Sequence, residues 1–385
     1  SLCVCAPPAN NRTTQHTPVE IPRQTTVDAA QFLENMRVGI LTFHLGANYG
    51  AYLQAWCLTQ AVRELGHDAS LINYKNKVLL DSNSLKPWVY RRPFRLLHDF
   101  RKYRAFHKAH VHMRLEPFTS DPARVDWNAY DAIVVGSDIV WNCELPYMGQ
   151  DRSYFGQFQV AYRGRLIAYA PSIGPMNPSY AAPSWVAEGL KKFHSIAVRD
   201  ANTQQFVENQ IGSRPPLVVD PTWLATQTET AQLSYKPRTS REILLVYSFP
   251  LKGRMVDEIK SFARKHNLLT VGVGYWQNWC DRNWPDVDPF EWVQLFRQAK
   301  YIVSGTFHGT LYAIREQRPF CLLANEGSDN KVSTALAITG LKNRHTSDPA
   351  AIERILLQPT DYDAVKTKLE EQRRQSLLQL KQALS

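Results

Sequence analysis

The chain has 385 residues, which is more than one ordinary hydrophobic core accommodates, so we expect two domains. Its net charge of +10 favours anionic partners such as phosphorylated metabolites, acidic glycans, a membrane surface or nucleic acid. The six cysteines are scattered without a CxxC pair, which excludes the usual zinc-binding patterns, and no apolar run reaches membrane-spanning length.

These features predict a soluble, cytoplasmic protein in a reducing compartment, at most docked on the inner face of the membrane. We expect neither a metal ion nor a bound cofactor, because the sequence shows no metal-ligand spacing and no dinucleotide-binding G-x-G-x-x-G.

The first half of the chain is predicted to be an α/β unit. Residues 1–36 are rich in Pro, Asn, Thr and Gln and predict a flexible tail, whereas 37–225 form the N-terminal domain. Short apolar runs predict strands over 37–43, 69–74, 130–138, 166–170 and 195–198, with helices over 51–65 and 185–193. The loop 44–50 follows the first strand, at the edge where open α/β sheets bind ligands.

The segment 86–114 differs from its surroundings because basic and aromatic residues alternate along it. A basic helix with an aromatic face can lie on an anionic membrane, which would give peripheral membrane contact. Alternatively, the aromatic face packs on the protein and the basic face is solvated. No nucleic-acid partner is expected, because helix-turn-helix, RNP and zinc-finger patterns are missing from the sequence.

The second half repeats the α/β pattern after a polar linker over 226–241. Within the C-terminal domain, 242–345, strands are predicted over 243–248, 268–272, 301–304 and 318–323, and helices over 254–265, from 288 and over 332–338. Helices over 351–357 and 361–383 then occupy the C-terminal part, 346–385. The expected fold class is α/β, with two Rossmann-like domains facing across a cleft, an arrangement that resembles the glycosyltransferase-B architecture.

The turn around His308 is the strongest candidate for a site. It follows a buried strand, and Gly305 and Gly309 suit a tight turn before an apolar helix that starts near Gly309. The first amides of that helix, including those of Gly309 and Thr310, can bind a phosphate or a carboxylate. His308 can carry a proton there near neutral pH. Alternatively, the turn is a capped strand-to-helix connection whose His bonds a neighbouring carbonyl.

Other polar residues follow strands of the first half. Asp138 can bind a hydroxyl and Trp141 can stack on a sugar, although Asp138 could instead cap a following helix. Arg199 can hold a carboxylate or phosphate through two parallel hydrogen bonds, or it can form a surface pair with Asp200.

Taken together, these segments resemble the polysaccharide pyruvyl transferase family. The resemblance rests on motifs that run in family order at 39–43, 48–51, 53–55, 135–138, 141–142, 198–200, 220–222, 307–310 and 331. It covers residues 37 to about 345, essentially the whole predicted fold. The sequence departs from the family pattern at Thr306, where many members have Arg, and at Ile139, where Gln is common.

The resemblance implies a transferase with phosphoenolpyruvate as co-substrate and no obligatory metal. The enolpyruvyl-derived group would move onto a sugar of a cell-surface polysaccharide or of its lipid-linked precursor, usually as a cyclic ketal, with release of phosphate. On this hypothesis His308 is the general acid and Asp138 a base. The donor would be bound by Arg199, His308, Lys331 and the amides of Gly309 and Thr310. The acceptor would be held by His44, Asn48, Tyr49 and Trp141.

Two other functions fit the sequence. His308 and Gly309, with Glu316 and Pro319, loosely resemble the segment with which nucleotide-sugar glycosyltransferases hold a diphosphate and a ribose. A non-catalytic glycan- or membrane-binding scaffold, acting through the basic segment, is the third reading.

Overall fold

The computed structural model describes residues 35–83, 93–145, 150–225, 235–324 and 329–385. Nearly all of the predicted N-terminal tail, residues 226–234 of the predicted linker and residues 86–92 of the basic segment lie outside these described residues.

The first half is built on a sheet of five parallel strands in the order β2-β1-β3-β4-β5. The strands are β1 Arg37–Leu41, β2 Asp68–Leu71, β3 Ala132–Val135, β4 Arg165–Tyr169 and β5 Ser195–Ala197. Val38 of β1 pairs with Ala69 of β2 on one side and with Ala132 of β3 on the other. All residues of β3 are buried, as expected for a parallel sheet that is covered on both faces.

The second half contains a sheet of six parallel strands in the order β11-β10-β9-β6-β7-β8. The strands are β6 Ile243–Tyr247, β7 Leu269–Val273, β8 Arg282–Trp284, β9 Tyr301–Ser304, β10 Phe320–Leu323 and β11 His345–Thr346. The prediction of an α/β fold with two Rossmann-like parallel sheets is confirmed. The short edge strands β8 and β11 were not predicted, because neither contains an apolar run.

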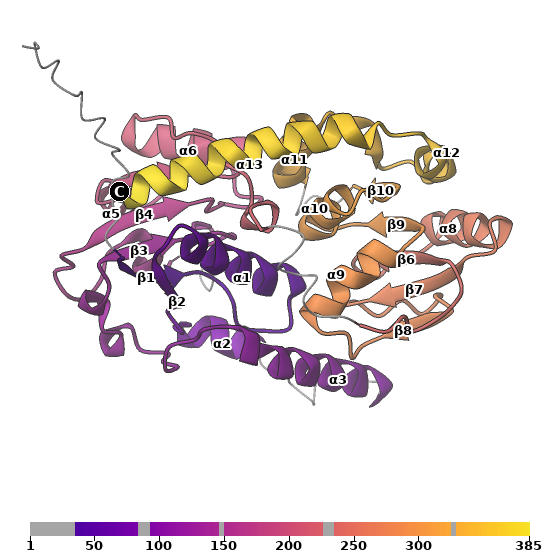
Figure 1. Ribbon diagram of the computed structural model, residues 1–385, viewed down its shortest axis with the longest axis horizontal. Coiled ribbons are helices and arrows are strands. Elements are labelled where there is room, and N and C mark those ends of the chain that lie inside the picture. Colours follow the sequence, from indigo (N-terminus) through magenta and orange to yellow (C-terminus); the bar gives the residue numbers. More distant parts are fainter. Residues whose placement is uncertain (1–34, 84–92, 146–149, 226–234, 325–328) are drawn as a thin grey trace, which may run out of the picture. The chain divides into compact units, whose positions relative to one another are not determined.

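Helices connect these strands and cover the sheets (Figure 1). They are α1 Tyr49–Glu64, α2 Lys77–Asn83, α3 Pro93–Ala109, α5 Ser184–Leu190, α6 Ala201–Ile211, α8 Arg254–Lys265, α9 Pro289–Gln298, α10 Phe307–Arg315, α11 Asp329–Thr339, α12 Ile352–Leu357 and α13 Tyr362–Leu384. Short 3-10 helices lie at His110–His112, Pro122–Arg124, Trp127–Ala129, Arg152–Phe155, Pro221–Trp223, Lys342–Arg344 and Pro349–Ala351. None of the helices in the described part of the chain is both long and apolar enough to cross a bilayer.

The helix α1 joins the two halves through its buried side chains. The ring of Tyr49 stacks on Trp292 of α9 at 5.3 Å, and its hydroxyl donates to the carbonyl of Val287 at 2.9 Å. Residues Tyr49–Thr59 are buried on all sides of the helix, although the sequence predicts an amphipathic helix. The second half therefore covers the face of α1 that would otherwise be exposed.

The last helix returns to the first half (Figure 1). The hydroxyl of Ser376 accepts from the amide of Val219 at 3.0 Å, and Arg165 of β4 donates to the carbonyl of Leu384 at 2.7 Å. The same helix also contacts α11. It therefore contacts elements of both halves.

Candidate active site

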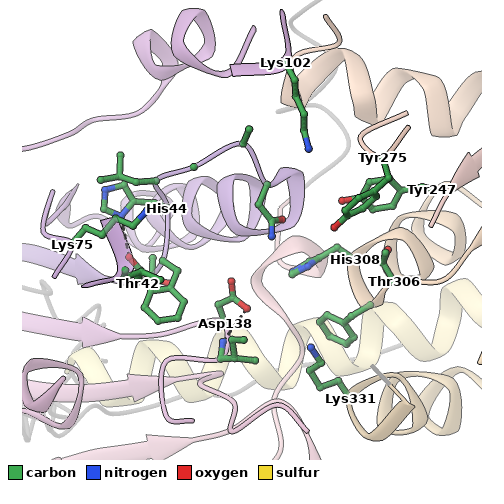
Figure 2. A pocket seen from close by; sticks show the side chains of 18 of the residues that line it. Thr42, His44, Lys75, Lys102, Asp138, Tyr247, Tyr275, Thr306, His308 and Lys331 are labelled. Atoms are coloured by element: carbon green, nitrogen blue, oxygen red, sulfur yellow. Dashed lines mark hydrogen bonds between the residues drawn. The ribbon is translucent and has the colours of Figure 1, made fainter. Parts of the chain in front are cut away.

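A cavity of about 570 Å³ is lined by the loops that follow strands of both sheets (Figure 2). This is the carboxyl edge, where parallel sheets bind ligands. The first half contributes residues 42–48, Tyr74, Lys75, Leu79, Lys102, Tyr103, Asp138, Ile139 and Tyr154. The second half contributes Tyr247, Phe249, Tyr275, residues 305–308 and Lys331. The turn around His308 thus faces the loops of the first half, as the sequence predicts.

The helix that carries His308 starts two residues earlier than predicted. Thr306 is its N-cap, and the hydroxyl of Thr306 accepts from the amide of Gly309 at 3.1 Å. The amide of Thr310 donates to the carbonyl of Thr306 at 3.2 Å. Both amides that we predicted to bind the donor are therefore used within the helix. The backbone amides of Phe307 and His308 come earlier in the helix than the amides of Gly309 and Thr310.

Gly309 is required by the packing of the turn rather than by a ligand. A Cβ atom at this position would lie 2.3 Å from the hydroxyl of Ser304 and 2.7 Å from the ring of Tyr247. Both distances are too short for any larger residue, so the groups that closely approach Gly309 belong to the protein itself.

His308 lies between the first turn of α1 and a carboxylate of the first half. A Cβ atom at Gly50 would lie 2.0 Å from His308 Nδ1, so only glycine leaves room for the ring. On its other side, Nε2 lies 3.7 Å from the carboxylate of Asp220. Nε2 is buried and has no hydrogen-bond partner among the described residues. The side chain is 12% exposed and reaches the cavity.

Arg199 supports this region from behind the cavity wall. Its guanidinium donates to Asp220 at 2.6 Å and to the hydroxyl of Ser137 at 3.0 Å, and it lies 3.4 Å from Asp138. The side chain is 1% exposed and does not line the cavity. The two terminal nitrogens of the Arg199 guanidinium therefore contact two aspartates of the protein, Asp220 and Asp138. The predicted alternative, a surface pair with Asp200, is wrong, because Asp200 is buried and caps α6.

The carboxylate of Asp220 is held in its charged form. Burial by itself raises the pKa of Asp220, but the positive charges of His308 and Arg199 and the hydrogen bond from Thr222 outweigh burial and hold this pKa well below its ordinary value. The amide and the hydroxyl of Thr222 donate to Asp220 at 3.0 and 2.8 Å. This fixed negative charge therefore faces the imidazole of His308.

Asp138 lines the cavity from a loop with unusual backbone geometry. Its φ is 71°, in the left-handed region. One carboxylate oxygen accepts from the amide of Ile139 at 2.9 Å and is the oxygen that faces Arg199. The side chain is 14% exposed. No hydrogen bond joins the other oxygen to the described residues, and the side chain lines the cavity.

Of the residues predicted to hold an acceptor, two line the cavity. His44 is 1% exposed, and its ring contacts the carbonyl of Thr42 at 2.9 Å and the side chain of Asn73 at 3.1 Å. Asn48 is the N-cap of α1, and its side chain accepts from the amide of Ala51. Burial lowers the pKa of His44, which favours its neutral form.

The other two predicted acceptor residues point into the core. Tyr49 and Trp141 are both fully buried and do not line the cavity. The indole of Trp141 donates to the carbonyl of Tyr154 at 2.8 Å and packs on Phe155. Neither ring is placed to stack on a sugar, so we assign them no contact with a substrate.

Two lysines of the cavity were missed from the sequence. Lys75 follows β2, and Lys102 lies on α3, where it was counted among the basic residues of the segment 86–114. The ammonium of Lys102 donates to the carbonyl of Gly274 at 2.9 Å and lies 5.3 Å from the ring of Tyr275. Burial lowers the pKa of both lysines to about 8. The sequence contains one indication that Lys102 faces inward. The apolar residue Phe106 lies four residues after Lys102, on the same helical face, and the structure shows that it is buried.

The predicted residue Lys331 completes the basic lining. It lies on α11, 5.8 Å from the ring of Phe307, and burial, followed by the charge of Arg199, lowers its pKa. Three lysines and His308 thus face the cavity, whereas Asp138 is the only carboxylate that lines it among the described residues. This charge balance favours an anionic ligand. In the described part of the chain, no three His, Cys, Asp or Glu side chains gather as metal ligands.

Several solved structures have a similar outline. The glycotransferase of kitacinnamycin is 11% identical, with 91% of this chain and 98% of that chain covered and a TM-score of 0.48. A putative UDP-N-acetylglucosamine 2-epimerase from Listeria monocytogenes is 9% identical, with 91% of both chains covered and a TM-score of 0.47. The E. coli heptosyltransferase WaaC with ADP is 12% identical, covering 89% and 100%, with a TM-score of 0.39. These scores are below 0.5, so the fold assignment rests on the strand topology given above.

Comparison at the level of sequence identifies the family. No curated protein matches the chain. The family model for polysaccharide pyruvyl transferase matches residues 48–327, from the N-cap of α1 to beyond β10. This range contains Asp138, Asp220 and His308 and therefore the centre of the cavity. The chain belongs to the polysaccharide pyruvyl transferase family, a family of transferases that act in polysaccharide biosynthesis.

Proposed function

We propose that this protein transfers the enolpyruvyl-derived group of phosphoenolpyruvate to a sugar of a cell-surface polysaccharide or of its lipid-linked precursor. The observation that carries the proposal is the basic cavity between the sheets, in which His308 lies beside a fixed carboxylate. Phosphoenolpyruvate has a phosphate and a carboxylate, so its binding requires several cations. Lys331 and His308 of the second half and Lys102 of the first half line the cavity and suit this donor (Figure 2).

In the proposed reaction, His308 gives a proton to the methylene carbon of the donor. Nε2 of His308 lies 3.7 Å from the carboxylate of Asp220. Protonation makes C2 of the donor cationic, and a hydroxyl of the sugar attacks C2 while Asp138 accepts the hydroxyl proton.

A second hydroxyl of the same sugar then closes the ring of the ketal. Its oxygen forms a bond with C2, the bond between C2 and the phosphate oxygen breaks, and the hydroxyl proton leaves with the phosphate. The acceptor gains the mass of a pyruvate less water. Arg199 takes part by positioning, since it fixes both Asp138 and Asp220.

Mass spectrometry tests this proposal directly. Phosphoenolpyruvate is incubated with a panel of lipid-linked and nucleotide-linked sugars, and the acceptor mass and the released phosphate are measured. His308→Ala should reduce the rate by about 10²–10⁴, because it removes general acid catalysis. His107→Ala is the matched control, because His107 is exposed on α3 and does not line the cavity. A rate for His308→Ala close to that of wild type would contradict the assignment.

The alternative of a nucleotide-sugar glycosyltransferase finds less support in the geometry. Glu316, the residue expected near a ribose, pairs with Arg297 at 2.6 Å and does not line the cavity. Isothermal titration separates the two functions, since heat with UDP or GDP and none with phosphoenolpyruvate would favour the alternative.

We also propose that the outer face of α3 contacts an anionic membrane, where a lipid-linked acceptor would be found. Leu97 and Phe100 are 58% and 54% exposed on this face, and Arg104 and Lys108 are exposed beside them. Apolar residues flanked by cations are suited to the interface of an anionic bilayer. The opposite face of α3 carries Lys102 into the cavity, so both features belong to the same helix.

A further inference from the structure

Lys75 is a buried cation that has no counter-ion in the described part of the chain. The residue is 4% exposed and lines the cavity directly after β2. No carboxylate among the described residues forms an ion pair with it, and its ammonium makes no hydrogen bond with them. The nearby carboxylate of Asp151 is engaged elsewhere, because it accepts from Tyr74 at 2.6 Å and from Asn76 at 3.2 Å.

An unpaired buried ammonium destabilises a fold unless something else compensates its charge. Burial lowers the pKa of Lys75 to about 8, so the charge is disfavoured but still present at neutral pH. The charge of Lys75 also contributes to the lowered pKa of His44, after the larger effect of burial. An anion bound at this point would stabilise the charge of Lys75, and the cavity gives such an anion access.

This basic point is separate from the donor end of the cavity. Figure 2 shows Lys75 and His44 on one side, Lys331 and His308 on the other, and Asp138 between them. A cavity of about 570 Å³ is in the range of sites for drug-sized ligands, so it has room for a sugar beside a three-carbon donor. With the donor at His308, a sugar whose hydroxyls face Asp138 extends towards Lys75.

We propose that Lys75 forms a second anion subsite, which binds an oxyanion of the acceptor sugar, either a phosphoryl group or a carboxylate. The inference rests on the proposed function, because it assigns the His308 end of the cavity to phosphoenolpyruvate. It gives the acceptor a chemical class: a sugar that already carries a negative charge at a distance from the hydroxyls that react.

Steady-state kinetics with matched acceptors tests the subsite. For each sugar of a panel, the methyl glycoside, the 1-phosphate and the corresponding uronic acid are compared at saturating phosphoenolpyruvate. The wild type should prefer an anionic form over the neutral glycoside by about tenfold to a hundredfold in KM, the usual effect of one charged hydrogen bond. The 1-phosphate and the uronic acid show which oxyanion is bound.

Variants of Lys75 locate this preference. Lys75→Met should abolish the preference for an anionic acceptor and leave KM for phosphoenolpyruvate within about twofold of wild type. Lys75→Arg should keep part of the preference. Lys77→Met is the matched control, because Lys77 is exposed on α2 and does not line the cavity. Lys75→Met should also melt at a higher temperature than wild type without ligand, because it removes an unpaired buried charge.

Three results would overturn the subsite. They are an anion preference that persists in Lys75→Met, a rise of KM for phosphoenolpyruvate in place of the acceptor, and a lower melting temperature of Lys75→Met, which would reveal a partner within the protein. Failure of the proposed function looks different: the wild type would not turn over phosphoenolpyruvate. In that case isothermal titration of the sugar 1-phosphates into wild type and Lys75→Met still measures the subsite, and equal affinities would contradict it.

Discussion

At the scale of single residues, the position of His308 depends on groups that are far away in the sequence. The carboxylate of Asp220 lies on one side of the ring. On the other side Gly50, which has no side chain, leaves space for the ring. The sequence shows all three residues within short motifs, but no pattern within a motif reveals that they meet. The direction of each side chain was equally hidden, as Trp141 and Tyr49 demonstrate by facing the core.

The contact between Gly50 and His308 gives a prediction at this scale. Gly50→Ala places a methyl group where the imidazole lies, so the ring must move. A displacement of about 1 Å can reduce the rate by about 10²-fold, and we expect a loss of kcat of that order. The helix itself should form at least as well, since alanine is a better helix former than glycine.

A double-mutant cycle provides the control for this prediction. In the background of His308→Ala, Gly50→Ala should reduce kcat no further, because the ring is already missing. Circular dichroism monitors the fold of each variant. Additive losses of kcat in the double variant would show that Gly50 acts on something other than His308.

At the scale of elements, the longer strands and helices could be predicted because they are continuous apolar or periodic segments. The exceptions are informative. The helix α6 was not predicted. Two of its four buried residues are the polar Thr203 and Gln204, so apolar residues do not recur along it with a clear helical period. The start of α10 was misplaced because the cap is Thr306, whose side chain occupies the amide of Gly309.

The two faces of α3 could not be assigned from composition, because both contain cations. The inner face gives a pH prediction: burial lowers the pKa of Lys102 to about 8, so this ammonium loses its proton as the pH rises above 8. The kcat/KM for phosphoenolpyruvate should therefore fall above about pH 8, since this ratio reports groups of the free enzyme. Lys102→Met should have a lower kcat/KM at pH 7 and a weaker alkaline decline.

The control for Lys102 is Lys108→Met, on the same helix but exposed and outside the cavity. It should retain the alkaline decline of the wild type. If Lys102→Met shows the same kcat/KM at pH 7 and the same decline, Lys102 does not bind the donor.

The outer face of α3 gives a prediction about membranes. Leu97→Ser with Phe100→Ser should reduce flotation with phosphatidylserine vesicles, because it removes the exposed apolar side chains. The melting temperature should change little, since both residues lie at the surface. Leu378→Ser on α13, where Leu378 is 53% exposed, is the matched control and should float like the wild type. Equal flotation of all three proteins would exclude this face as the contact.

At the scale of the whole molecule, the helices α1 and α13 contact elements of both α/β halves. Aromatic packing of Tyr49 on Trp292 and the return of α13 to the first sheet join segments that are hundreds of residues apart. The sequence predicts two such halves from their repeated strand and helix patterns. It does not predict which loops meet, because those contacts depend on how the sheets pack. This is why the basic residue Lys75 could be recognised only as part of the assembled cavity.

The central claim is that His308 delivers a proton to the methylene carbon of phosphoenolpyruvate. The reaction in D₂O tests it, because the transferred proton is then a deuteron. We predict a ketal whose methyl group contains one deuterium in the wild-type reaction, and loss of this product in His308→Ala. A product that retains the carbon–carbon double bond as an enolpyruvyl ether, or undiminished formation of the deuterated ketal by His308→Ala, would contradict the account.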